Sequence, residues 1–288
     1  MKINYCMKRS DRIKLNFIRN WNLPGQERLS HKFKPSEQFK ADLHNGITWL
    51  TTEDLAIYTT ADNYIEWTIL STGTYEHEIG KLIRVSLKPG ETALDIGANI
   101  GLQSLRMSQA VGPTGKVYAF EPLGFLQDKF KKNTGLNKAA NVTLLPFALS
   151  DTAGETQFEI DPAAWNQGTF SLINSGGTTN QTVAIKIADD LPEIMALQQL
   201  AFIKIDVEGF EFQVLKGLKQ TLKKHRPRVI FEFDANYWAR TNQSITACFA
   251  FLQELNYSIY QINAVSCELV TSPSKAESGN LFCIINDI

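Results

Sequence analysis

The pattern of hydrophobic and polar positions changes near residue 75. Before it the pattern is mixed, with a basic start and two short strand-like segments, "GITWL" and "AIYTT". After it, apolar strand segments alternate with segments whose apolar residues recur at helical spacing. Residues 79–87 follow this helical spacing, and a Pro-Gly pair ends the predicted helix. The pattern therefore predicts an N-terminal extension or cap over residues 1–74 and a larger domain over 75–288.

The larger domain alternates predicted strands and helices, which is typical of an α/β fold with a parallel sheet covered on both faces. Helices are expected over residues 101–110, 124–137 and 210–224 and over "ITACFAFLQEL". The last two strands have no helix between them, which predicts an antiparallel pair. In chain order the predicted strands are "TALDIG", "GKVYAFEP", "NVTLLPFAL", "LAFIKIDV", "RVIFEF", "YSIYQIN" and "LFCIIND".

Residues 151–190 interrupt this alternation after the third strand. "QFEI" and "VAIKI" alternate like exposed strands, and a loose segment rich in Gly, Asn and Thr lies between them. Such a length is unusual for a connection in a compact domain, and long loops often carry function. We interpret the segment as a β insertion and a candidate substrate lid. A hairpin without a function is an equal alternative.

Composition excludes some partners. The 288 residues carry a formal net charge of −1, so nothing in the overall charge attracts nucleic acid or an anionic membrane. No apolar run reaches the roughly 18 residues of a membrane span. The four cysteines lie far apart without metal-ligand spacing, which is typical of a reducing compartment, and we expect a cytoplasmic protein. The first 35 residues are basic; they form either a solvated arm or a contact with a partner, such as a second copy in a homo-oligomer.

The loop after the first strand, "LDIGANIG", is a candidate ligand site. Ligands of open parallel sheets bind beyond the carboxyl ends of the strands. Gly97 and Gly101 let the backbone approach a ligand closely, and Asn99 tolerates the left-handed conformation. Together with Asp95 these residues form the spacing D-x-G-x-N-x-G. A strand, a tight turn and a helix all agree here, which favours a nucleotide-type ligand.

The next two strand ends offer groups for the rest of a nucleotide. Glu121 ends the second strand and can accept hydrogen bonds from both hydroxyls of a ribose; the alternative is that it caps the following helix. At the third strand end, Phe147 and Ala148 are candidates for the walls of an adenine site, with Asp151 as an acceptor for the exocyclic amine.

The predicted crevice is rich in carboxylates, with only Lys204 to offset them from within the fourth strand. So many acids repel phosphate groups and suit a cationic ligand. S-adenosylmethionine meets this requirement, because it has a ribose, an adenine, an ammonium and a sulfonium but no phosphate. The acids are Asp95, Glu121, Asp206, Glu208, Glu232 and Asp234.

Several of these segments resemble the FkbM-type S-adenosylmethionine-dependent methyltransferases. "LDIGANIG", "VYAFEP", "ALSD", "FIKIDVEGFEFQVLKG" and "RPRVIFEF" occur in that family's order and spacing over about residues 75–235. The resemblance implies a Rossmann-like class I methyltransferase fold with a mostly parallel seven-stranded sheet of order 3-2-1-4-5-7-6, its last strand antiparallel. It also implies methyl transfer to a hydroxyl of a sugar, polysaccharide or secondary metabolite. By position, Asp95, Gly97, Asn99 and Gly101 would hold the methionine part of the cofactor, and Glu121 the ribose.

"IKIDVEGFE" supplies the candidate catalytic groups, because methyl transfer to an alcohol requires alignment and removal of a proton. Strand alternation places Asp206 and Glu208 on one side. We expect Asp206 to face the cofactor and the acceptor hydroxyl, with Glu208 as the second candidate base. Glu232, at the matching position of the fifth strand, is the third. Glu211 is interpreted as an acid at a helix N-terminus.

Four alternatives stay open. The acids at 206, 208 and 232 are suitable ligands for Mg²⁺, although a metal is not favoured, and His77 is a weaker candidate for the base. An NAD-dependent oxidoreductase would use Glu121 in the same way, but the third glycine of its loop is missing. A non-catalytic ligand-binding protein on the same fold is the other possibility. The predicted acceptor is a small molecule or glycan, and not nucleic acid, because no basic aromatic patch is found.

Overall fold

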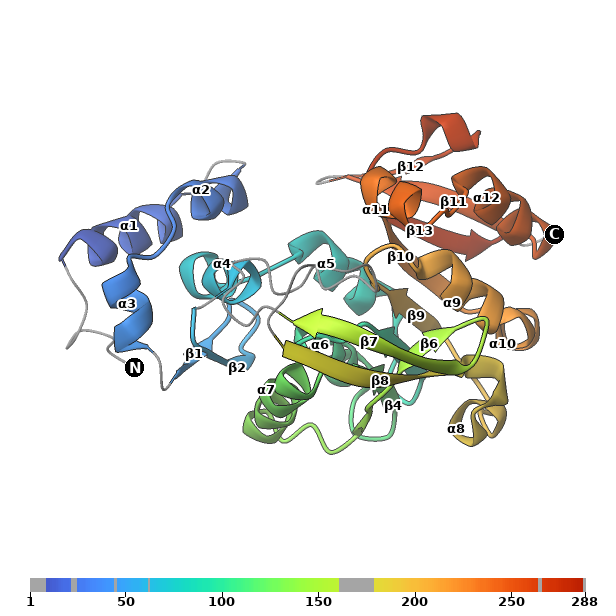
Figure 1. Ribbon diagram of the computed structural model, residues 1–288, viewed down its shortest axis with the longest axis horizontal. Helices are drawn as coiled ribbons and strands as arrows, with labels where there is room; N and C mark the ends of the chain where they lie inside the picture. The colour runs from blue at the N-terminus through green and yellow to red at the C-terminus, as the bar shows by residue number, and fades with distance from the viewer. Residues whose placement is uncertain are drawn as a thin grey trace. The chain divides into compact units, whose positions relative to one another are not determined.

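The computed structural model describes residues 9–21, 25–43, 46–61, 63–160, 179–263 and 266–286. The chain forms two compact units (Figure 1). The first comprises the described residues up to His77, and the second comprises the described residues from Glu78 onward. Each unit is described by itself.

The first unit has its own small core. Leu15, Phe39, Trp67 and Leu70 are all buried and pack in one cluster. The two strand-like segments of the sequence are strands, and they form an antiparallel pair. The helices before them were not predicted. The elements are α1 (Arg9–Arg19), α2 (Gln26–Lys32), α3 (Glu37–Asp42), β1 (Ile47–Leu50), β2 (Ala56–Thr59) and α4 (Tyr64–Thr72).

The second unit is built on an eight-stranded sheet of order β12-β11-β13-β10-β9-β3-β4-β5. Across the sheet, β10, β9, β3, β4 and β5 are neighbours in this order, and all of them pair in parallel. β13 runs antiparallel to both of its neighbours, β10 and β11. Without β12, the strands numbered along the chain lie in the order 3-2-1-4-5-7-6; β12 adds an edge strand outside the predicted seven. The strands are β3 (Thr92–Ile96), β4 (Lys116–Phe120), β5 (Val142–Leu145), β9 (Phe202–Ile205), β10 (Arg228–Phe233), β11 (Tyr257–Ile262), β12 (Cys267–Leu269) and β13 (Gly279–Ile285).

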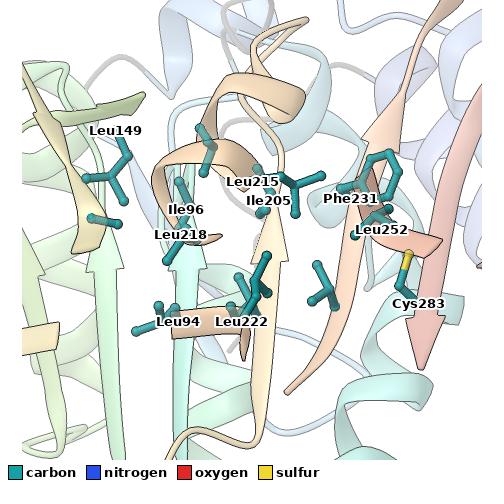
Figure 2. Packing of buried hydrophobic residues seen from close by; sticks show 14 of the residues in the cluster. Leu94, Ile96, Leu149, Ile205, Leu215, Leu218, Leu222, Phe231, Leu252 and Cys283 are labelled. Carbon is teal, nitrogen blue, oxygen red and sulfur yellow. The ribbon is translucent and has the colours of Figure 1, made fainter. Parts of the chain in front are cut away.

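Alternate residues of the central strands pack on opposite faces of this sheet. Leu94, Ile205 and Phe231 lie in a cluster with Leu215 and other residues of the helices that follow β9, as Figure 2 shows. The side chains that point to the opposite face of these strands pack against α5 and α6. The helices and helical turns of this unit are α5 (His77–Ser86), α6 (Leu102–Val111), α7 (Gly124–Leu136), η1 (Ala188–Asp190), α8 (Pro192–Met195), α9 (Glu211–Gly217), α10 (Lys219–His225), α11 (Ala235–Arg240), α12 (Ile245–Glu254) and η2 (Pro273–Lys275).

The predicted third strand is in fact two strands in different sheets. β5 ends at Leu145, and β6 (Ala148–Ser150) pairs with β8 (Thr179–Ile187), which in turn pairs antiparallel with β7 (Gly154–Ile160). The insertion is therefore a β structure, as its alternating pattern indicated. Its middle, residues 161–178, lies outside the described residues.

Two further differences concern helices. The predicted helix over 210–224 is divided into α9 and α10 at Leu218, and α11 was not predicted. Within the described ranges, no helix has both the length and the apolar character needed to cross a membrane.

Candidate active site

The turn between β3 and α6 lies directly against the turn that follows β9. Gly97 has a φ of 80°, and a Cβ at this position would lie 1.8 Å from the carbonyl oxygen of Asp206. The Asp206 N–H also donates to the Ile96 carbonyl (2.9 Å). Glycine is therefore required at 97 by a neighbouring chain segment, and not only by a ligand as the sequence suggested. This packing brings the ends of β3 and β9 together.

The rest of this turn also has left-handed conformations, which the sequence allowed at Asn99. Asn99 has a φ of 51°, and its side-chain oxygen accepts from the Ile100 N–H (2.8 Å). Gly101 has a φ of 90° and precedes α6; a Cβ there would lie 2.8 Å from the ring of Phe130. Gly101 thus permits close packing of α7 against the turn.

Asp95 is completely buried at the end of β3. Its Oδ2 accepts from the hydroxyl of Ser104 on α6 (2.5 Å), while its Oδ1 receives no hydrogen bond from any residue that the structure describes. Burial raises the pKa of Asp95, and the Lys204 ammonium opposes this rise. A buried acceptor without a donor is costly, so Oδ1 is suited to accept from a ligand.

Glu121 is buried beyond the end of β4 and organises two loops. Its Oε2 accepts from the Asn99 N–H (2.8 Å) and its Oε1 from the Leu123 N–H (2.9 Å). Burial raises its pKa to about 7. Carboxylate oxygens have several lone pairs, so these contacts leave acceptor capacity for ribose hydroxyls. The alternative role given by the sequence, a cap of the following helix, is not observed: Leu123 is at the N-cap position of α7, and it makes no side-chain capping hydrogen bond.

Gln181, in the insertion strand β8, was not predicted as a site residue. Its Nε2 donates to the Pro122 carbonyl (3.0 Å), and its Oε1 accepts from the Gly124 N–H (3.1 Å). Both polar atoms of this side chain therefore hold the loop that begins at Glu121. No local sequence signal could have shown this contact, because the residues are almost 60 positions apart.

The predicted adenine-site residues lie at the junction of the two sheets. Phe147 is buried between β5 and β6, packs edge-on against Phe120 and carries the Lys186 ammonium 4.2 Å from its ring centroid. Ala148 begins β6. The carboxylate of Asp151 forms an ion pair with Lys216. Part of the acceptor capacity of Asp151 is therefore already used within the protein.

The three predicted catalytic carboxylates converge. One carboxylate oxygen from each of Asp206, Glu208 and Glu232 lies within 4.8 Å of the others. The Nζ of Lys204 donates to Asp206 Oδ2 (2.9 Å) and is itself buried. Like charges so close together favour protonation of at least one group, unless a cation balances them. Oxygen ligands of this kind also suit Mg²⁺ by their chemistry.

Glu208 reaches this cluster by a route that the sequence did not predict. β9 ends at Ile205, so strand alternation does not extend to Glu208, which instead has a left-handed φ of 56° in the following turn. Its Oε2 is buried and accepts no hydrogen bond from the described residues. Burial, followed by the charges of Asp206 and Glu211, raises the pKa of Glu208 to about 9. Glu208 is therefore protonated at neutral pH.

Two other candidates from the sequence have different surroundings. Asp234 caps α11, its Oδ1 accepting from the backbone N–H groups of Asn236 and Tyr237. His77 belongs to the first unit, where its Nδ1 lies 3.8 Å from Glu53 Oε1.

Comparison with known proteins identifies the family. The model of the methyltransferase FkbM domain matches residues 95–259, more than half of the chain. This chain belongs to the FkbM methyltransferase family. The matched range begins at Asp95, ends beyond Glu232 and contains every residue of the candidate site. The class I methyltransferase fold and the resemblance found in the sequence are thereby confirmed.

Curated relatives match over part of their length. The chain is 31% identical over 150 residues to the hexuronic acid methyltransferase AglP of Haloferax volcanii, covering 51% of this chain and 58% of that protein. It is 30% identical over 158 residues to the methyltransferase sdnD of Sordaria araneosa, covering 44% and 60% respectively. The chain thus spans less than two thirds of these relatives. Among solved structures, the methyltransferase FkbM of Methylobacillus flagellatus aligns with 95% of this chain and 59% of its own, at 13% identity and a TM-score of 0.42.

Proposed function

We propose that this FkbM-family chain is an S-adenosylmethionine-dependent methyltransferase that methylates an oxygen of a sugar-containing acceptor. The observation that carries the proposal is the junction of two turns. The turn of Gly97 and the turn of Asp206 are in direct contact, so a cofactor loop and a carboxylate cluster adjoin at the ends of β3 and β9. Family membership favours this reading over an NAD-dependent oxidoreductase or a non-catalytic binder.

The residues present fit the cofactor. Asp95 Oδ1 is a buried acceptor without a donor among the described residues, which suits an ammonium. Glu121 retains acceptor capacity for ribose hydroxyls, and we propose Phe147, Ala148 and Asp151 for the adenine end. The turn at Gly97, Asn99 and Gly101 would hold the methionine part. When bound, S-adenosylmethionine supplies a methyl group activated by its sulfonium.

The acidic cluster serves the acceptor. Asp206 is paired with the Lys204 ammonium at 2.9 Å and is our candidate for the group that accepts the hydroxyl proton. Glu208, which carries its own proton at neutral pH, would donate a hydrogen bond and orient the acceptor. Glu232 is the third candidate and extends the negative field of the cluster. We expect acceptor specificity to reside in the β7–β8 part of the insertion and in the N-terminal region, which is also the candidate homo-oligomer contact.

Charge in the cluster argues for a hydroxyl acceptor. A hexuronic acid, the substrate class in the name of the Haloferax relative, offers both hydroxyl and carboxylate oxygens. Three protein carboxyl groups within 4.8 Å of one another disfavour a substrate carboxylate beside them. We therefore propose ether formation at a hydroxyl of the acceptor.

The first test is calorimetric titration with S-adenosylhomocysteine, with NADH titrated in parallel. We expect binding of the homocysteine compound only, weakened about 10- to 100-fold in Glu121→Ala because hydrogen bonds to the ribose are lost. Absence of binding by folded wild-type protein would overturn the proposal.

The acceptor is tested with a hexuronic-acid-terminated oligosaccharide and its neutral hexose counterpart, using radiolabelled cofactor. A methyl ether resists alkaline hydrolysis, whereas a methyl ester is cleaved, so treatment of the product with base separates the two oxygens. We expect a base-stable product, and a loss of about 10²- to 10⁴-fold in kcat for Asp206→Asn with homocysteine affinity retained. A base-labile product would refute the hydroxyl assignment.

A further inference from the structure

The turn that carries Asp206 and Glu208 is held by a side chain outside the acidic cluster. Glu211, in the first turn of α9, is 1% exposed. Its Oε1 accepts from the N–H groups of Val207 (2.9 Å) and Gly209 (3.1 Å). Its Oε2 accepts from the Nε1–H of Trp238 on α11 (2.8 Å). Its position at a helix N-terminus was predicted, but its partners show a further role.

The backbone conformation of this turn requires such support. Glu208 and Gly209 both have positive φ angles, 56° and 102°. For a glutamate this conformation is unfavourable and persists only where the surroundings determine it. Here Glu211 holds the N–H groups on both sides of Glu208, and the Thr241 hydroxyl donates to the Gly209 carbonyl (2.7 Å).

The turn also sets the geometry of the candidate catalytic groups. Because β9 ends at Ile205, the direction of the Glu208 side chain depends on the turn and not on strand pleating. With the turn in this conformation, carboxylate oxygens of Asp206 and Glu208 lie within 4.8 Å of each other and of Glu232. A change of about 1 Å at a catalytic group can reduce a rate by about 100-fold.

We propose that Glu211 is a positioning residue for methyl transfer: its buried carboxylate holds the 206–209 turn so that Asp206 and Glu208 meet Glu232 at the acceptor. This inference rests on the proposed function. It assigns to Glu211 no contact with the substrate or the cofactor. Its effect on the reaction passes through the backbone of Val207 and Gly209.

The test compares Glu211→Ala with a matched control, Asp189→Ala. Asp189 also accepts two backbone N–H groups and one side-chain donor, from Gln220 and Thr221 at the start of α10 and from no residue of the 206–209 turn. Both variants lose comparable hydrogen bonds, and both are expected to melt at a lower temperature. A purely structural role predicts the same consequences for both.

Hydrogen exchange of the peptide covering 203–211 gives a readout that needs no acceptor. We expect the amides of Val207 and Gly209 to exchange faster in Glu211→Ala and at the wild-type rate in Asp189→Ala. With the acceptor that the methylation assay selects, kcat of Glu211→Ala should fall about 100-fold. Its KM and its affinity for S-adenosylhomocysteine should change less than about threefold. Asp189→Ala should retain kcat within about twofold, because its hydrogen bonds lie outside the turn.

A rescue variant separates the loop contacts from the contact with Trp238. In Glu211→Gln the amide oxygen can keep the loop contacts, but its NH₂ then faces the Trp238 Nε1–H. The second substitution Trp238→Phe removes this clash of donors, and we expect the double variant to recover about tenfold in kcat over Glu211→Gln.

The outcomes separate the two proposals. Unchanged exchange of the turn in folded Glu211→Ala, or an equal loss of kcat in Asp189→Ala, would overturn the positioning role. Failure of the wild-type protein to bind S-adenosylhomocysteine would overturn the function instead, whatever the exchange experiment shows.

Discussion

The contact between the two turns can be tested by adding a single methyl group. Gly97→Ala would place a Cβ 1.8 Å from the Asp206 carbonyl oxygen, whereas an ordinary contact begins near 3.4 Å. One of the two turns must therefore move by roughly 1.6 Å, and both are backbone segments that lack a flexible end. The φ of 80° adds a second cost, since a non-glycine residue in this region loses about 1–2 kcal/mol.

Overpacking of this kind costs about 1–3 kcal/mol in addition, so we expect Gly97→Ala to lose about 2–5 kcal/mol in the free energy of unfolding. Gly90→Ala is the matched control. Gly90 has a φ of 89° in the same unit, but its nearest neighbour is the Thr114 hydroxyl at 3.7 Å, an ordinary contact. The control therefore carries the conformational cost alone, about 1–2 kcal/mol.

Denaturation in urea measures both variants, and binding of S-adenosylhomocysteine follows the effect on the site. We expect Gly97→Ala to be less stable than Gly90→Ala by at least about 1 kcal/mol and to bind the ligand more weakly. Equal stability of the two variants would refute the reasoning, because it would mean that the turns are not in contact.

Three further predictions concern buried polar groups. Ser104→Ala removes the hydroxyl that donates to Asp95 Oδ2 and should lower the free energy of unfolding by about 1–3 kcal/mol, measured by urea denaturation. The carboxyl of Glu208 has a pKa of about 9 in the folded protein against an ordinary 4.5, so the folded state binds the proton more tightly. Its contribution to stability is present below pH 4.5 and is lost as the pH rises through 9; melting curves should therefore show wild type falling relative to Glu208→Gln over this range. Removal of divalent metal with EDTA should leave methyl transfer within about twofold, because the Lys204 ammonium already neutralises Asp206; loss of activity that Mg²⁺ restores would contradict this.

Much of the second unit follows from local patterns. The short apolar runs of β3, β9 and β10 indicate strands that are buried on both faces of a parallel sheet, and alternate side chains of each strand point to opposite faces. The positive φ angles at Gly97, Asn99 and Gly101 agree with the residue types in the loop. Glu232 was expected beside Asp206 because parallel strands end at the same edge of a sheet, and this geometry is what the structure has.

Contacts between distant segments could not be predicted. Glu211 and Trp238 are 27 positions apart, and Gln181 is 57 positions from Gly124, so no local pattern connects them. The boundary between β5 and β6 was missed for a related reason. One continuous apolar segment, "NVTLLPFAL", contributes to two sheets, and its pattern is the same in either. In each case the partner in space decides the role of the residue.

The acids of "IKIDVEGFE" are tolerated at the end of a buried strand because each is stabilised by a different means. Asp206 is paired with the ammonium of Lys204, and Glu211 accepts N–H groups from the backbone and from Trp238. Glu208 has neither kind of partner at its buried oxygen and is stabilised as the neutral acid. A positive charge bound beside it would favour the ionised form, so the binding of a cationic ligand to this cluster is expected to release a proton. The charge of the cluster therefore depends on the ligand that is bound there. An apolar strand end could not change its charge when a cationic ligand binds.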